Sequence, residues 1–188
     1  MARLRESGAI DLARDTTERA IDRLEMAVRL DPGEALFRVN LGDALVTAGR
    51  LPEAVEQFDA ASRLQPDLPE ARRGQGESAL MKGDRERAER EFRAALQGDP
   101  GLARAANFLG YILAQKGDAE GAAAEYRRAV EIEPDLYDAH ASLGMIYAEH
   151  LNEPGKAAHH LRRALTLAPE HPGTERLREL LRGLEKRE

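Results

Sequence analysis

Apolar and small residues recur along this chain at the spacing of an α-helix. In one stretch, Leu109 and Leu113 lie on one face of a first predicted helix, and Ala122, Tyr126 and Ala129 lie on one face of a second. Residues three or four positions apart share a side of an α-helix, so each set predicts a face that must be buried. The pattern therefore predicts two successive amphipathic helices joined by a short polar turn.

The same two-helix pattern returns at intervals of 34 residues. Its clearest marker is the proline that ends each second helix, at Pro32, Pro66, Pro100 and Pro134, with Pro169 arriving one residue late. Four other positions also repeat with this period. One is a glycine in the first helix. The other three lie in the second helix, where an alanine is followed by an aromatic residue or leucine and then by another alanine. These positions are Gly8, Gly42, Gly76, Gly110 and Gly144; Ala20, Ala54, Ala88, Ala122 and Ala157; Leu24, Phe58, Phe92, Tyr126 and Leu161; and Ala27, Ala61, Ala95, Ala129 and Ala164. The chain is therefore predicted to hold five copies of one helix–turn–helix unit.

Turn residues mark the break between the two helices of most copies. Gly49, Gly83 and Gly117 are typical helix stops, and Asp84, Asp118 and Asn152 are expected N-caps of the helix that follows. The glycines inside the first helices need another explanation, because glycine destabilises a helix interior by about 1 kcal/mol relative to alanine. We interpret them as points where the paired helices touch. A helix pair cannot bury its apolar face alone, so the pairs are expected to stack on a continuous core.

This combination of residues resembles the tetratricopeptide repeat (TPR) family. The family pattern has Leu-Gly in the first helix, Ala, Phe or Tyr and Ala in the second, and a closing proline; Leu109-Gly110 and Tyr126 carry it here. The resemblance runs from about Met1 to Pro169. The family's early tryptophan is replaced by Arg38, Arg72, Ala106 and His140. The repeats are therefore expected to pack with less bulk than the family pattern implies.

Two copies fit the family pattern less well than the others. The third has Gln75 in place of leucine, between Gly74 and Gly76. These two glycines could form a hinge or admit a ligand backbone, or they could simply mark a weaker repeat. The first copy has Ser7-Gly8 and no glycine turn, so its helix pair is the least well defined.

The expected fold is all-α, a right-handed α-solenoid of about five TPR helix-turn-helix repeats plus a C-terminal capping helix. The expected array covers residues 1–171, and the expected capping helix covers residues 172–188, with leucines on one side and Arg and Glu on the other. The repeats are placed at about 1–34, 35–68, 69–102, 103–136 and 137–171.

The resemblance also implies where a partner binds. TPR arrays present their first helices on the concave side of a superhelix, and peptides of partner proteins lie there, against residues 4, 7, 8, 11, 14 and 15 places after each closing proline. The groove residues that we predict on this basis are Asn40, Asp43, Arg73, Glu77, Met81, Arg104, Asn107, Phe108, Tyr111 and Met145. Phe108 and Tyr111 are the most informative, because aromatic residues are scarce in this chain and often anchor interfaces. The alternative is that these two rings pack between adjacent repeats.

The residues offer little support for catalysis or for a metal site. The chain has no cysteine, which excludes disulfides and thiolate zinc sites. Its five histidines lie in the last third, but the adjacent His159 and His160 point about 100° apart on a helix and cannot easily face one ion. Known catalytic motifs are missing. We expect a protein that is not an enzyme and that has no cofactor and no bound metal.

The charge and hydropathy of the chain limit the classes of partner that we expect. Lys and Arg number 28 against 34 Asp and Glu, a formal charge of -6 without a basic stripe, so a nucleic-acid partner is not expected. Apolar runs fall short of the roughly 20 residues that span a bilayer, so membrane insertion is not expected. Since no signal-peptide pattern stands at the N-terminus, the cytoplasm is the default compartment if the chain is complete.

The sequence thus favours a non-catalytic protein–protein interaction scaffold that binds a partner peptide or helix. One alternative is a self-assembling TPR homo-oligomer, which a concentration series by light scattering would reveal. Another is a regulatory TPR segment of a larger enzyme. A clamp for the carboxylate tails of chaperones is disfavoured, because no three consecutive repeats supply its Lys, Arg and Asn residues in register. Asp43 and Glu77 stand in the groove, and Gly74 and Phe108 occupy clamp positions.

Overall fold

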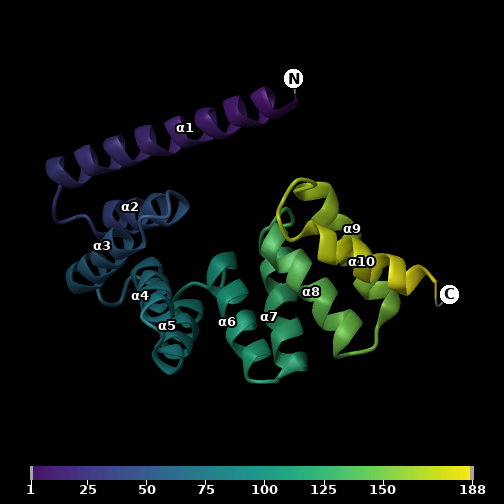
Figure 1. Cartoon of the computed structure of the whole chain (residues 1–188). Coiled ribbons are helices and arrows are strands. Elements are labelled where there is room, and N and C mark those ends of the chain that lie inside the picture. Colours follow the sequence, from purple (N-terminus) through teal and green to yellow (C-terminus); the bar gives the residue numbers. More distant parts are fainter. Residues whose placement is uncertain (1, 187–188) are drawn as a thin grey trace. The chain divides into compact units, whose positions relative to one another are not determined.

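The computed structural model describes residues 2–186, and the side chains of residues 15–186. The described residues form ten α-helices and no strand, so the predicted all-α class is confirmed (Figure 1). The chain divides into two compact units, Met1–Gly98 and Asp99–Glu188, called unit 1 and unit 2 below. Unit 1 contains α1 (Ala2–Leu30), α2 (Ala35–Thr47), α3 (Leu51–Leu64), α4 (Pro69–Met81) and α5 (Arg85–Gly98). Unit 2 contains α6 (Ala103–Gln115), α7 (Ala119–Ile132), α8 (Tyr137–Glu149), α9 (Pro154–Leu167) and α10 (Thr174–Glu185).

The helices pair as the periodic pattern predicts. In unit 1, α2 pairs with α3 and α4 pairs with α5, and α4 also packs on α3 and α2. In unit 2, α6 pairs with α7 and α8 pairs with α9, and α8 also packs on α7 and α6. We call α2, α4, α6 and α8 the first helices and α3, α5, α7 and α9 the second helices. Among the described residues, no helix is both long and apolar enough to cross a membrane.

The first predicted repeat differs from the expectation. Residues 2–30 form α1, one uninterrupted helix, where a helix–turn–helix was expected (Figure 1). The physical reason is that no glycine or proline lies between Gly8 and Pro32 to break the helix. Ile21 of α1 is buried against α2 and α3, whereas Ala20 is exposed although its counterparts in later copies are buried. The second-helix position is therefore filled, but no first helix folds back onto it.

The helix pairs touch where the glycines were expected to allow it. A methyl carbon added at Gly42 would lie 2.5 Å from the ring of Phe58, far inside van der Waals contact. The other first helices show the same arrangement, since an added methyl carbon would lie 2.6 to 2.9 Å from a side chain of the paired second helix. The remaining pairs are Gly76 with Phe92, Gly110 with Tyr126, and Gly144 with Leu161. The interpretation of these glycines as contact points is confirmed.

Gly74, the additional glycine of the third copy, has its own packing role. A methyl carbon at Gly74 would lie 2.6 Å from Phe58, on the preceding helix pair, while Gly76 faces Phe92 of its own pair. The ring of Phe58 is thus held between Gly42 and Gly74 and has no exposed surface. The two glycines of α4 therefore let it approach one helix on each side.

A polar network accompanies this close approach. Asp59 of α3 accepts hydrogen bonds from Gln75 Nε2 and Ser78 Oγ, both at 2.9 Å, and from Lys82 Nζ at 2.8 Å. Arg87 of α5 donates to the side-chain oxygen of Gln75. Partial burial opposes ionisation of Asp59, but these donors hold its pKa below the ordinary value. Gln75, which stands where the family has leucine, thereby joins α4 to both neighbouring second helices.

The predicted turn chemistry is confirmed for the three glycines and the two aspartates. Asn152, also expected as an N-cap, requires a correction, because Glu153 is the N-cap residue of α9 and Asn152 has a φ angle of 51°, in the left-handed region. Gly49, Gly83 and Gly117 all have positive φ angles, between 74° and 81°, which glycine adopts without strain. Asp84 accepts a hydrogen bond from the Arg87 amide at 3.0 Å, and Asp118 accepts one from the Gly121 amide at 2.8 Å. These side chains satisfy amide groups that the first helical turn leaves unpaired.

The last helix, α10, packs on α8 and α9. Leu177 is buried there, and Leu180, Leu181 and Leu184 are partly buried around it. The opposite side carries exposed Arg and Glu residues, among them Arg182, which pairs with Glu175 at 3.1 Å. An apolar side toward the array and a charged side toward water is the arrangement expected of a capping helix.

Candidate functional site

The predicted groove residues of unit 1 lie on α2 and α4, and most of them are engaged within the unit. Arg73 donates two hydrogen bonds to the Asp43 carboxylate, at 3.0 and 2.8 Å, and also pairs with Glu77. Burial opposes the charge of Arg73, but the carboxylates of Glu77 and Asp43 raise its pKa. Met81 is half-buried against the apolar core, and Asn40 is exposed. Arg73, Asp43 and Glu77, called the Arg73 triad below, therefore fasten α2 to α4.

This is a correction to the expectation that Arg73 and Glu77 project into an open groove. Arg73 is 5% exposed and Glu77 is 2% exposed, so neither presents a free charged group to solvent. The physical reason is that the two first helices pack closely enough for Arg73 to reach a carboxylate on each. Of these five predicted residues, Asn40 is the most accessible to a ligand.

The predicted residues of unit 2 lie on α6 and α8. Tyr111 is 43% exposed, and Arg104, Asn107, Phe108 and Met145 are all half-buried. The side-chain oxygen of Asn107 has no hydrogen-bond partner among the described residues. The structure brings Tyr111 and Met145 together, because both line one hollow of about 350 Å³. Its remaining lining is Ala114, Gln115, Tyr126, Ser142, Ile146, Glu149, His150 and Arg176.

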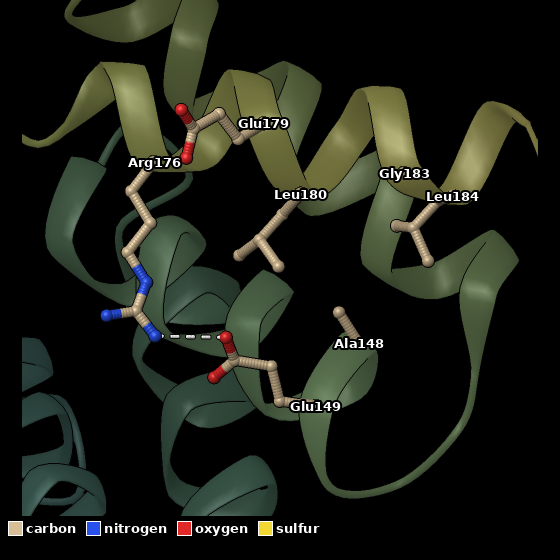
Figure 2. A pocket seen from close by; sticks show the side chains of 7 residues that line it. All are labelled: Ala148, Glu149, Arg176, Glu179, Leu180, Gly183 and Leu184. Carbon is tan, nitrogen blue, oxygen red and sulfur yellow. Dashed lines mark hydrogen bonds and ion pairs between the residues drawn. The ribbon is translucent and has the colours of Figure 1, made fainter.

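A second hollow, of about 530 Å³, lies between α8 and α10 (Figure 2). Leu180 and Leu184 of α10 point into it beside Ala148 of α8. At one end, Arg176 reaches from α10 to the carboxylate of Glu149, with Nη2 to Oε1 at 3.0 Å. Glu149 and Arg176 line both hollows, so the hollows adjoin. Together they form a trough along α6, α8 and α10, called the unit 2 groove below.

The lining of the unit 2 groove follows one sequence register. The positions 11, 14 and 15 residues after Pro100 are Tyr111, Ala114 and Gln115, and those after Pro134 are Met145, Ala148 and Glu149. The same count after Pro169 gives the α10 residues Leu180, Gly183 and Leu184, which the sequence prediction missed. Extending the count beyond the last repeat would have found them. The helix α10 thus contributes to the groove in the manner of a first helix.

A histidine pair joins α8 to α9. His140 donates from Nε2 to the Pro134 carbonyl at 3.1 Å, so its Nδ1 accepts from Nδ1 of His160 at 3.0 Å. Burial lowers the pKa of both rings, and the nearby His140 and His159 help to lower that of His160 to about 4. In the described part of the chain, no group of three or more His, Asp or Glu could hold a metal ion.

The histidine pair predicts a pH dependence of stability. The folded pKa of His160, about 4, lies below its ordinary value of 6.5, so the unfolded chain binds more protons between these values. The free energy of unfolding should therefore fall as the pH drops from about 6.5 to about 4, by about 2 kcal/mol after allowance for partial exposure. Urea unfolding of the chain and of His160→Gln over this range measures it. A pH slope unchanged in His160→Gln would contradict the prediction. The exposed His150, which does not contribute to the pKa shifts of the pair, provides the His150→Gln control.

Comparisons with known proteins agree with this architecture. Family models described as tetratricopeptide repeat or TPR repeat match residues 11–69, 110–150 and 137–171, which is more than half of the chain. No curated protein matches the chain in sequence.

Solved structures give the same fold. A thermophilic TPR protein of Thermus thermophilus is 19% identical, with a TM-score of 0.70 over 94% of this chain and 96% of that one. Cut9, from the APC/C hetero-tetramer Cut9–Hcn1, is 22% identical, with a TM-score of 0.75 over 95% of this chain and 34% of that one. YrrB, described as a TPR protein with an unusual peptide-binding site, is 21% identical, with a TM-score of 0.57 over 91% of this chain and 88% of that one. At these identities the likeness shows the fold, and the predicted all-α solenoid is confirmed.

Proposed function

The chain belongs to the tetratricopeptide repeat family, and from that premise we propose that it is a non-catalytic scaffold that binds a partner peptide in the unit 2 groove. The observation that carries the proposal is the pair of adjoining hollows along α6, α8 and α10, with the exposed ring of Tyr111 lining one of them. Ligand sites are typically concave, with an apolar lining and a few polar groups that fix orientation. The unit 2 groove has this composition.

The packing of α6 supports the proposal. Gly110 meets the ring of Tyr126 on the α7 side, and Leu109 and Leu113 are buried, so the pairing of α6 does not use Tyr111. Leaving a large aromatic ring in water has no benefit for the fold of an isolated chain, whereas aromatic rings are frequent anchors of interfaces. YrrB, a protein of similar fold, is described as having a peptide-binding site, which is consistent with the proposal.

The proposal predicts the effect of removing the apolar side chains of Tyr111 and Met145 from the unit 2 groove. In the double variant Tyr111→Ala, Met145→Ala, partner affinity should fall about 30-fold, because two interface anchors are lost. The measurement is capture of partners from a lysate of the source cells by the immobilised full chain, followed by titration of the captured partner. Phe108 is left unchanged, because it is half-buried and its loss would disturb packing.

The matched control is Ile132→Ala, which removes an exposed apolar side chain from α7 of the same unit. The control should retain the partner, and circular dichroism should show equal helicity in all three proteins. Equal binding by the double variant and the parent chain would place the partner site outside the unit 2 groove.

Self-association is the second candidate function. It is favoured by α1, where Met26 is 57% exposed and Leu30 is 81% exposed on a helix that has no first-helix partner of its own among the described residues. A mass that rises with concentration in light scattering would support it.

A further inference from the structure

The lining of the hollow between α8 and α10 carries an excess of negative charge. Glu149 and Glu179 supply two carboxylates to this lining, and Arg176 supplies one guanidinium (Figure 2). Of these three residues, Glu149 and Arg176 also line the hollow on the α6 side and form the junction of the two hollows. Among the described residues, Glu149 forms an ion pair with Arg176 alone, and Glu179 forms none. The formal charge of the whole chain is also negative, at -6. A cationic group on a ligand is therefore favoured at this point over an anionic one.

The ion pair at the junction is open to exchange. The side chains of Arg176 and Glu149 are 66% and 33% exposed, so water screens their attraction and the pair contributes little to the fold. A cation of the ligand can take the place of Arg176 beside Glu149, while the Arg176 side chain turns into solvent. The buried Arg73 triad of unit 1 offers no such exchange, because the Arg73 side chain is 6% exposed.

Apolar surface lies on both sides of the junction. Tyr111, Met145 and Ile146 line the hollow on the α6 side, and Leu180 and Leu184 line the hollow on the α10 side. Each hollow, at about 350 and 530 Å³, has the size of a ligand site. A ligand that fills both must therefore present apolar groups at its ends and cross the Glu149–Arg176 pair between them.

We propose that the unit 2 groove selects peptide segments in which one Lys or Arg lies between two apolar side chains. One apolar side chain occupies each hollow, and the basic side chain pairs with Glu149 at the junction. This inference rests on the proposed function and adds the chemistry of the partner. Acidic segments are selected against, because they would meet two carboxylates and a guanidinium that is already paired.

The test uses three dye-labelled pentapeptides with the full chain. The probes are Leu-Ser-Lys-Ser-Leu, Leu-Ser-Glu-Ser-Leu and Ser-Ser-Lys-Ser-Ser, each with an uncharged dye in amide linkage at the N-terminus and an amidated C-terminus, so that the termini carry no charge. Side chains at alternate positions of an extended peptide face the same way, so the three variable positions can face the groove together. By fluorescence anisotropy at low salt, the first probe should bind about tenfold tighter than either of the others, and about 0.15 M salt should reduce its advantage over the acidic probe.

Three variants test whether Glu149 and Arg176 at the junction cause the preference for the basic apolar probe. Glu149→Gln should weaken the basic apolar probe about fivefold, and Arg176→Gln should strengthen it about threefold by removing the competing guanidinium. Glu131→Gln removes one exposed carboxylate from α7 of the same unit and should change nothing. Opposite effects at Glu149 and Arg176 cannot arise from damage to the fold, which would weaken binding in both variants.

Several outcomes would overturn the inference. Equal affinity for the basic and acidic apolar probes would show that the junction does not select charge. If the preference for the basic over the acidic apolar probe were unchanged in both Glu149→Gln and Arg176→Gln, residues other than Glu149 and Arg176 would cause it. Failure of all probes to bind, while the Tyr111→Ala, Met145→Ala variant still loses its cellular partner, would refute the basic segment and leave the proposed function intact.

Discussion

Replacing Phe58 by alanine is expected to lower the free energy of unfolding of unit 1 by about 3–5 kcal/mol. The ring has no exposed surface and fits between the backbones of α2 and α4 at Gly42 and Gly74. Removal of the ring leaves a cavity lined by two glycines, which have no side chains that could fill it. The expected loss is therefore that of a fully buried aromatic residue whose site cannot collapse.

Hydrogen exchange in the full chain measures this loss, because repeat arrays can open locally and need not unfold in one step. Protection of α2, α3 and α4 should decrease together in Phe58→Ala. The control Leu64→Ala lies on the same helix, 41% exposed, and should change stability by less than about 1 kcal/mol. If both substitutions had the same small effect, Phe58 would not be the side chain that joins the two helix pairs.

The second large effect is expected for Arg73→Met, at about 3 kcal/mol. This change removes the guanidinium that bridges Asp43 of α2 and Glu77 of α4, and Glu77 is almost fully buried. Breaking a buried ion pair from one side typically costs several kcal/mol, because the remaining charge stays desolvated. Urea unfolding followed by circular dichroism provides the measurement.

The double variant Arg73→Met, Glu77→Met distinguishes this cause from loss of packing. Removal of both charges should restore most of the stability, since buried pairs can often be replaced by apolar side chains without loss. Arg90, exposed on α5, offers the control Arg90→Met, which should be nearly neutral. Equal destabilisation in the single and double variants would mean that the size of Arg73, and not its charge, holds α2 against α4.

The helix pairs could be predicted from the sequence because each local rule pointed to the same answer. The period of the prolines, the glycines at helix ends and the alanines of the second helices all fit one repeat. The interior glycines were the most informative, since their destabilising effect required a compensating contact, and rings such as Phe58 and Tyr126 provide it. The first copy was predicted less well, because Gly8 kept the register although the residues after it contain no helix break.

The site was harder to predict than the fold. A stripe of positions after each proline identifies residues on the outer face of a first helix, but it cannot say which of them find partners on a neighbouring helix. Arg73 and Glu77 belong to that stripe, yet they bond to each other, and Arg73 also bonds to Asp43, 30 residues earlier in the chain. Conversely, Arg176 and Leu180 were missed because their helix was interpreted as a cap alone.

We propose that the partner binds along α6, α8 and α10. Amide hydrogen exchange of the full chain, measured with and without the captured partner, tests it most directly. We predict slower exchange on binding at residues 111–115, 142–149 and 176–184, and little change in α7 and α9. Protection confined to the second helices or to unit 1 would contradict the claim.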